Sequence, residues 1–343
     1  MKLKFNLLIL ALGLFYLSAQ ADEFTREQHS GYLKSSIKAL DITNKFGSIT
    51  INDFGGDSVT VDVKITIDNG NENKANYLMD QIDINTRKVG SLLKVETKID
   101  DNFKTKQNFS IDYTINIPAD RDLKVSNKFG SVAVSSLNAN GNFDISYGNI
   151  NTGSLAAPDN QMIIMDISYG KADIESVNRM QIALQYSKLF LGEAQALRVE
   201  SKYSGINLKE IKTMDLDSKY DGVQIEELGD LKADSKYTNY DIEELKKSLG
   251  LDTQYGSVRV EEVASGFDNI DITNMYGGID IGLGNANYYL DASCDYCDIK
   301  YPDEKFKGSR EKDNHTLNIK GTIGAESAQK VTINSRYGGV KLK

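Results

Sequence analysis

RVESKYSGINLKEI (198–211), DLDSKYDGVQIEEL (215–228) and KADSKYTNYDIEEL (232–245) are three copies of one pattern. In each copy a strand-like run ends in Ser-Lys-Tyr, turns over small or polar residues, and resumes as a second short apolar run. The tyrosines Tyr203, Tyr220 and Tyr237 are 17 residues apart. A fixed period of this length is typical of a solenoid, in which each repeat adds one coil to a continuous core.

The aromatic position of this pattern recurs along most of the chain. Leu216, Ser218 and Tyr220 alternate with charged residues, so strand alternation predicts that all three face inward. Coils about 4.8 Å apart would then stack each aromatic ring on the next. The alternative is an exposed ladder that binds sugars or flat surfaces. The rings share phase with Val, Ile and Leu, and the chain has no Trp, which favours the core. The predicted core aromatic ladder consists of Phe46, Phe129, Tyr147, Tyr169, Tyr186, Tyr203, Tyr220, Tyr237, Tyr255, Tyr276, Tyr296 and Tyr337.

Further columns support the coil pattern. Gly often follows the aromatic residue, as at Gly130 and Gly148, where it would permit a positive φ at the corner. The slot two residues before the aromatic often holds Ser, Thr or Asn, whose side chains can hydrogen-bond along a stack. The position eight residues after the aromatic is apolar in eight successive repeats, which predicts a core ladder of Leu137, Leu155, Val177, Ala194, Ile211, Leu228, Leu245 and Val263.

The strand lengths divide the chain into regions. Residues 22–122 contain longer alternating runs, such as 58–68, and are expected to form an N-terminal β region leading into the solenoid. Residues 123–301 carry the regular repeats, and residues 302–343 are expected to form capping rungs. We expect residues 22–343 to be one continuous all-β domain, a parallel β-helix or β-solenoid.

The first residues match a secretory signal peptide. Lys2 and Lys4 precede an apolar run over 5–17, and Ala19-Gln20-Ala21 forms a small-residue cleavage site, which predicts a signal peptide over 1–21. The alternative is an N-terminal membrane anchor, for which the run is short because a spanning helix needs about 20 residues. We therefore expect an exported chain, periplasmic or extracellular, with no transmembrane segment after cleavage.

The charge balance narrows the range of partners. The sequence has a formal net charge of −9, and cleavage removes Lys2 and Lys4, which takes the charge to −11. An acidic exported chain without a basic cluster argues against nucleic acid as a partner. A cell-surface glycan or an envelope protein is the expected partner, and the oligomeric state stays open.

The two cysteines, Cys294 and Cys297, occupy the slots that Asn274 and Gly277 hold in the preceding repeat. Export favours oxidation, so a local disulfide is predicted, with free thiols and a redox or metal role as alternatives. Residues three apart in an extended strand are separated by about 10 Å, whereas a disulfide needs Cα atoms within about 7 Å. The coil is therefore expected to bend one residue earlier here than in its neighbours.

Charged columns flank the aromatic position. Lys202, Lys219 and Lys236 take the outward slot just before the aromatic residue, and glutamate pairs such as Glu226-Glu227 take the next corner. Such columns are usually solvated faces that keep stacked edges soluble. The alternative is an interaction surface, for which the three lysines are the candidate residues.

Catalysis has little support in the sequence. Parallel β-helices host polysaccharide-degrading enzymes in which carboxylates do acid–base work, but here the acids recur in columns instead of one cluster. We recognise no Ser/His/Asp set, phosphate loop or metal-ligand set. No catalytic, cofactor-binding or metal-binding residue is therefore assigned, and no cofactor is expected, although a cluster formed only in three dimensions would escape this argument.

The recurring unit, N/S-x-[FY]-G-x-[IV]-x-[IVL], resembles the bacterial putative adhesin family of β-strand repeats. The matching segments are SNKFGSVAV (126–134), the strand YTINIP (113–118) that leads into the first coil, and INSRYGGVKL (333–342). The resemblance covers most of residues 40–343 and implies a right-handed β-helix-like fold in an exported bacterial protein. The cysteine pair departs from the usual motif.

Three hypotheses about function follow. The first is an exported, non-enzymatic β-solenoid with a structural or adhesin-like binding role at the cell envelope. The second is a carbohydrate-active β-helix enzyme, which a single pocket combining acids of raised pKa would support. The third is a periplasmic partner in envelope-stress signalling.

Overall fold

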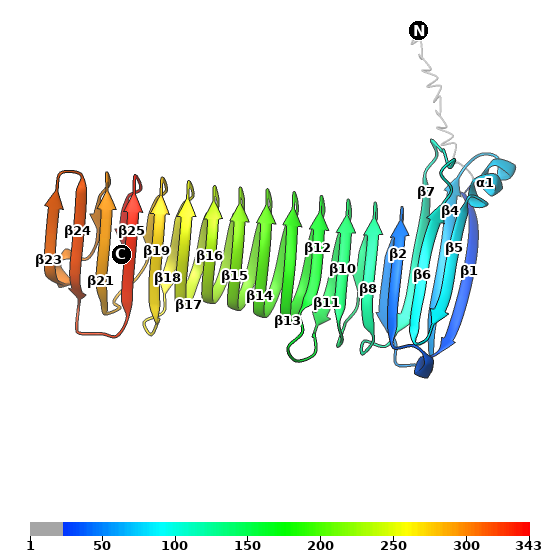
Figure 1. The fold of residues 1–343 in the computed structure, drawn as a ribbon, viewed down its shortest axis with the longest axis horizontal. Coiled ribbons are helices and arrows are strands. Elements are labelled where there is room, and N and C mark those ends of the chain that lie inside the picture. Colours follow the sequence, from blue (N-terminus) through cyan, green and yellow to red (C-terminus); the bar gives the residue numbers. More distant parts are fainter. Residues whose placement is uncertain (1–22) are drawn as a thin grey trace, which may run out of the picture.

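The computed structural model describes residues 23–343, and the predicted signal peptide over 1–21 lies outside them. The protein is a rod of stacked strands, with β1 near one end and β23 at the other (Figure 1). Strands take up 68% of the described residues and helices 4%, and the parallel coils make about nine turns. The predicted all-β class and parallel β-solenoid are therefore confirmed.

The N-terminal region starts the rod with antiparallel pairs. β1 pairs with β4, β4 with β7, and β5 with β6, whereas β6 and β7 run parallel to the first coil strands. The helix α1 packs against β1 and β4. β4 matches the long strand predicted over 58–68, and β1 has 11 residues as well. The elements are β1 (Glu23–Leu33), β2 (Ala39–Lys45), β3 (Ile49–Asp53), β4 (Ser58–Asp68), α1 (Glu72–Met79), β5 (Ile82–Val89), β6 (Leu92–Ile99) and β7 (Phe109–Ile117), with a 3₁₀ turn over Lys34–Ser36.

The following coils have two faces that meet at the aromatic corner. Face 1 holds the strand that precedes each aromatic residue, and face 2 holds the strand that follows it. In the central coils one long, bent strand starts on face 2 and ends on face 1, so both faces pair from coil to coil along the same strand. The elements are β8 (Asp122–Lys128), β9 (Val132–Val134), β10 (Gly141–Ser146), β11 (Asn149–Leu155), β12 (Ile163–Ser168), β13 (Lys171–Gln185), β14 (Lys188–Lys202), β15 (Gly205–Lys219), β16 (Gly222–Lys236), β17 (Asn239–Gln254), β18 (Val258–Val263), β19 (Asn269–Met275) and β20 (Ile279–Ile281).

Columns of inward side chains fill the rod. The position eight residues after the aromatic is buried in all eight predicted repeats, with exposed fractions of 0 to 5%, so this core ladder is confirmed. The small polar slot is buried as well, and Ser235 Oγ donates to Thr253 Oγ1 at 2.9 Å in the next coil. This hydrogen bond between coils satisfies two hydroxyl groups that burial would otherwise leave unpaired.

The aromatic residues form the predicted stack, but their predicted place in the core is wrong. All twelve have a positive φ, between 51° and 66°. Every one except the half-buried Phe46 is 40 to 51% exposed. Strand alternation holds only inside a strand, and the strand ends one residue earlier, for example at Lys219 before Tyr220. The left-handed backbone of the aromatic residue then turns its ring outward at the corner.

The glycine that follows the aromatic residue serves close approach between coils. Gly130 and Gly148 do not have a positive φ, so the predicted reason for glycine is wrong at these positions. A Cβ at Gly148 would lie 2.0 Å from the carbonyl oxygen of Gly130, and a Cβ at Gly170 would lie 1.9 Å from that of Gly148. Glycine is needed because the backbones of successive corners almost touch.

The last repeat does not extend the end of the rod. β25 pairs with β19 on one side and β21 on the other, and β26 lies in the same way between β20 and β22. The order of the repeats predicted a terminal cap over residues 302–343. This prediction is wrong, because residues 330–342 lie inside the stack. The hairpin β23–β24 ends face 1 instead, antiparallel to β21. The elements are β21 (Tyr288–Asp295), β22 (Ile299–Lys300), β23 (Phe306–Asp313), β24 (Thr316–Ile323), β25 (Lys330–Arg336) and β26 (Val340–Leu342), with a 3₁₀ turn over Asp303–Lys305.

Buried tyrosines predict a loss of stability in alkaline solution. The Tyr113 hydroxyl lies 2.6 Å from Thr97 Oγ1 in the core, and burial raises the pKa of Tyr113 from 10.0 to about 12, while the hydrogen bond to Thr97 lowers it. The unfolded chain therefore releases this proton more readily, and stability is lost as pH rises from about 10 to about 12, by about 2–3 kcal/mol for this group. Burial also raises the pKa of Tyr240 and Tyr288.

Urea unfolding of the wild type and of Tyr113→Phe across this pH range measures the effect. The variant should lose less stability than the wild type above pH 10, since it retains only the other buried phenols. The same alkaline loss in both proteins would contradict the assignment to Tyr113.

Candidate functional site

An exposed stack of aromatic rings runs along the corner between the two faces, and we call it the aromatic ridge. Neighbouring ring centroids are 4.6 to 5.1 Å apart, with interplanar angles of at most 23°. Phe109 packs on Phe46 at one end, and His315 packs on Tyr296 at the other. In spatial order the ridge consists of Phe46, Phe129, Tyr147, Tyr169, Tyr186, Tyr203, Tyr220, Tyr237, Tyr255, Tyr276, Tyr337 and Tyr296.

The stacking decides which part of each ring a partner can reach. Because the face of each ring lies against its neighbour, the ridge presents ring edges and hydroxyl groups to solvent. Within residues 23–343, the one side-chain hydrogen bond to a ridge hydroxyl runs from Arg336 Nη2 to Tyr337, at 3.4 Å. The ridge therefore offers a row of phenol donors and acceptors, and it does not offer ring faces on which a sugar could stack.

The three predicted lysines come together beside the ridge. Lys202, Lys219 and Lys236 are the last residues of β14, β15 and β16 and are direct neighbours in register. Each lies at the surface immediately before a ridge tyrosine, and Lys219 Nζ is 4.0 Å from Asp217 Oδ1. The three lysines form a positive row beside the ridge, with an acid close to the middle one.

Other cations contact the ridge through its rings. Lys45 Nζ lies 4.9 Å from the ring centroid of Phe46, and Lys128 Nζ lies 5.1 Å from that of Phe129. The Arg336 guanidinium lies 5.0 Å from the ring of Tyr337. Such cation–π contacts stabilise both partners by about 0.5–1 kcal/mol at exposed sites.

The opposite flank of the ridge carries two lysines that sequence reasoning missed. Lys171 and Lys188 open β13 and β14 and are neighbours in register. Lys171 Nζ lies 2.8 Å from Asp173 Oδ2 and 4.6 Å from the ring centroid of Phe190. Their position two residues after an aromatic, where other repeats often hold small residues, is the sequence signal that could have identified them.

Stacked glutamates form a row on face 2, at the bend of the long strands. Lys246 Nζ bridges two of them, at 2.6 Å from Glu244 and 3.5 Å from Glu227, and the hydrogen bond that Lys246 donates to Glu244 raises the pKa of Lys246. Among residues 23–343, no three His, Cys, Asp or Glu side chains converge as metal ligands. In register order the row is Glu193, Glu210, Glu227, Glu244 and Glu262.

A second acidic row on face 1 includes Asp166. Burial raises the pKa of Asp166, and the charges of Asp144 and Glu200 raise it further. Asp166 and Glu200 line a hollow of 360 Å³ where Ala183 interrupts the row. An acid of raised pKa in a pocket is the feature expected of the enzyme hypothesis. Here the hollow is the gap left by one short side chain in a repeated row.

The larger hollows follow the repeat as well. A furrow of 1220 Å³ runs along face 2 from Asn52 to Glu243, and a hollow of 640 Å³ lies on face 1 between Arg198 and Thr273. Both are lined by the same positions in successive coils. The repeating columns therefore continue through these hollows, without the unique cluster of functional groups that an active site needs.

Buried polar residues support the middle of the ridge from below. Ser187, Ser204, Asp221 and Thr238 stand where other coils have the corner glycine, and all are buried. The Ser187 backbone N–H donates to Ser204 Oγ at 3.1 Å, and the Ser204 N–H donates to Asp221 Oδ1 at 2.6 Å. Ser218 Oγ donates to Asp221 Oδ2 at 2.6 Å. These hydrogen bonds connect successive corners and hold the tyrosines in place.

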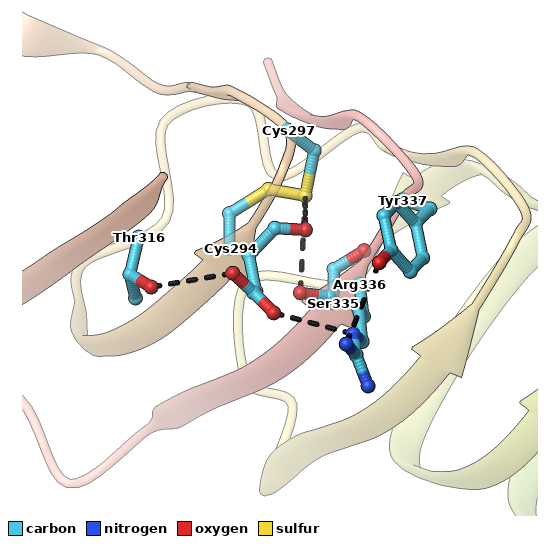
Figure 2. A network of polar contacts seen from close by, with 7 residues as sticks. Cys294, Cys297, Thr316, Ser335, Arg336 and Tyr337 are labelled. Atoms are coloured by element: carbon cyan, nitrogen blue, oxygen red, sulfur yellow. Dashed lines mark hydrogen bonds and ion pairs between the residues drawn. A yellow bond between two sulfur atoms is a disulfide. The ribbon is translucent and has the colours of Figure 1, made fainter. Parts of the chain in front are cut away.

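The coil at Cys294 and Cys297 is closed by a disulfide, with Cα atoms 5.4 Å apart (Figure 2). The predicted early bend is wrong, because this coil turns at Tyr296 as its neighbours turn at their own aromatic residues. The left-handed backbone of Tyr296 is enough to bring Cys294 and Cys297 together. In the adjacent coil a hydrogen bond from Ser335 Oγ to the Gly338 carbonyl, at 2.6 Å, closes the same gap.

The fold and the ridge together define a class, a parallel β-solenoid with an exposed aromatic stack at one corner. In the part of the chain that the structure describes, no helix is long and apolar enough to cross a membrane. The chain matches no protein-family model and no curated protein sequence.

Solved structures of bacterial proteins are similar to this chain at low identity. A putative adhesin from Bacteroides fragilis is 14% identical, with 93% of this chain and 97% of that one covered and a TM-score of 0.34. A putative lipid binding protein from Parabacteroides distasonis is 12% identical (94% and 97% covered, TM-score 0.33), as is a putative adhesin from Parabacteroides merdae (93% and 96%, 0.29). The TM-scores are too low to transfer a site or an activity.

Proposed function

We propose that this chain is an exported, non-enzymatic β-solenoid with a structural or adhesin-like binding role at the bacterial cell envelope. The aromatic ridge and the lysine row Lys202, Lys219 and Lys236 form the binding surface. Residues 22–343 act as one continuous domain, and the partner is a cell-surface glycan or an envelope protein.

The exposure of the ridge carries this proposal. Large contiguous apolar patches on a soluble protein usually mark interaction sites, and aromatic residues are enriched at interfaces. Eleven ridge rings are 40 to 51% exposed, and each is held between its neighbours. Rings that are already fixed lose little conformational entropy on binding, so most of the contact energy is available for affinity. A surface repeated at every coil suits an extended or repeating partner.

Charge reversal of the lysine row tests the surface. Replacing Lys202, Lys219 and Lys236 together by glutamate should weaken binding to immobilised envelope fractions, or to the glycan found by array screening, by about tenfold, or about 1.4 kcal/mol. The loss should shrink at high salt, because exposed charges are screened. Titration by surface plasmon resonance at two salt concentrations measures both effects.

A matched control variant carries glutamate at Lys209, Lys212 and Lys247, which are exposed lysines away from the ridge with the same total charge change. This variant should bind like the wild type. Equal weakening in both variants would show that net charge, and not the ridge, governs binding. A wild type that binds nothing in a broad glycan and envelope-protein screen would contradict the proposed function.

Export has its own test. Protein recovered from the envelope or the medium of the producing cells should begin at Asp22, since cleavage is predicted after Ala21. N-terminal sequencing together with cell fractionation measures this. An intact N-terminus in a cytosolic fraction would contradict export and leave the binding measurement unaffected.

A further inference from the structure

The coil formed by residues 330–342 lies between two coils that precede it in the chain, and we call it the inserted coil. On face 1, Ile333 faces Ile272 of β19 on one side and Ala292 of β21 on the other. On face 2, Val340 faces Ile279 and Ile299. Figure 1 shows β25 between β19 and β21. The ridge follows the same order, because Tyr337 stacks between Tyr276 and Tyr296.

Contacts on both sides hold the inserted coil. Tyr276 N–H donates to the Arg336 carbonyl at 2.9 Å, and Tyr337 N–H donates to the Asp295 carbonyl at 3.0 Å. Arg336 Nε lies 3.2 Å from Asp295 Oδ2 (Figure 2). The other oxygen of this carboxylate, Oδ1, accepts a hydrogen bond from Thr316 Oγ1. Val331, Ile333, Val340 and Leu342 are 0 to 3% exposed. The inserted coil is therefore buried and hydrogen-bonded on both sides.

The two coils that flank the inserted coil form its walls, and the chain connects them to each other without passing through the inserted coil. The coils at 269–281 and 288–300 are joined by residues 282–287, and the β23–β24 hairpin follows before the chain returns through residues 324–329. Removing the inserted coil would leave two strand edges on each face unpaired, about two coil spacings apart. We call the space between these walls the strand slot.

The slot selects its occupant by a demanding pattern. It needs apolar residues at the positions of Val331 and Ile333, an aromatic residue with left-handed backbone, and then glycine. A Cβ at Gly338 would lie 1.8 Å from the Gly277 carbonyl oxygen, so other residues are excluded there. An arbitrary peptide fails this requirement, whereas the same segment of a second copy meets it in full.

We propose that the strand slot is a strand-binding site, and that residues 330–342 of a second copy of this chain occupy it in exchange for the chain's own. Residues 324–329 can span about 20 Å when extended, which lets the segment leave its slot while the hairpin stays in place. Exchange restores the same contacts, so concentration decides between the two forms. A short linker gives an effective concentration in the millimolar range, so exchange is expected in concentrated protein or during refolding.

Trapping with cysteines in full-length chains tests the exchange. Thr332 lies opposite both Asp271 and Asp291 in register, at the surface of face 1. One chain carries Thr332→Cys and the other carries Asp271→Cys. The two are unfolded, mixed at high concentration, refolded and oxidised. Disulfide-linked heterodimers on non-reducing gels should exceed those of Thr332→Cys mixed with Asp215→Cys by about tenfold, because Asp215 lies on face 1 away from the slot.

Two further combinations make the outcome decisive. A single chain carrying both Asp271→Cys and Thr332→Cys, refolded at low concentration, should close its own disulfide and stay monomeric, which shows that the pair can bond. Thr332→Cys mixed with Asp291→Cys should also link two chains, since β21 stays with its own copy. If the single-chain pair closes but neither mixture exceeds the Asp215 control, the proposal is overturned. Linking at Asp271 without linking at Asp291 would overturn the assignment to residues 330–342, because a larger segment would then be exchanging.

Discussion

Replacing Gly148 by alanine is expected to lower the free energy of unfolding by about 3 kcal/mol. The added Cβ would lie 2.0 Å from the carbonyl oxygen of Gly130, and the Gly148 carbonyl already limits the approach of Gly170. Gly130 and Gly170 lie in corners that connect paired strands, so the clash can be relieved only by spreading the coils and weakening their hydrogen bonds. Urea unfolding followed by circular dichroism measures the change.

Gly222 provides the matched control. It follows an aromatic residue by two positions, its φ is not positive, and a Cβ there would meet nothing within 4 Å. Alanine at Gly222 should therefore leave stability unchanged or raise it by about 0.4–1 kcal/mol through the unfolded state. Equal destabilisation by the two substitutions would contradict close packing of the corners as the reason for glycine.

Replacing Asp221 by alanine is expected to cost about 3 kcal/mol of folding stability. Its carboxylate is 5% exposed and accepts hydrogen bonds from the Ser204 backbone N–H and from Ser218 Oγ, each at 2.6 Å. Removing the acceptor leaves a buried N–H and a buried hydroxyl to find other partners. Equilibrium unfolding of the purified variant measures the loss.

Asp234 is the control for this substitution, since it is an exposed aspartate on the outward side of β16. Asp234→Ala should change the free energy of unfolding by less than about 0.5 kcal/mol. The free energy of unfolding of Asp221→Asn should fall between those of Asp221→Ala and Asp234→Ala, because the amide keeps one acceptor oxygen. If Asp221→Ala is as stable as Asp234→Ala, the buried hydrogen bonds do not support the corner as described here.

Much of the scaffold could be predicted because its information is local. The period between Tyr203 and Tyr220, and the apolar column through Leu228, follow from alternation within short strands, and the structure confirms the parallel solenoid and the buried column. The pairing partner of Cys294 was also accessible, since Cys297 is its only possible partner within the chain.

The candidate surface was predicted only in part. The lysine row beside the ridge follows from strand phase, because Lys219 is the last strand residue and points outward. The exposure of the ridge was not predicted, because strand alternation was extended one residue too far, to Tyr220. Lys171 and Lys188 were missed since their position is basic in only a few repeats.

The sequence by itself determined the period, the strand faces and the residues that fill the rod, because these depend on neighbours along the chain. Only the tertiary structure decided three other features. The rings point outward because the corner takes a left-handed turn, and glycine is required because the carbonyl of the preceding coil lies against it. The inserted coil lies between two earlier ones because strand pairing depends on contacts among distant residues, which sequence order alone does not encode.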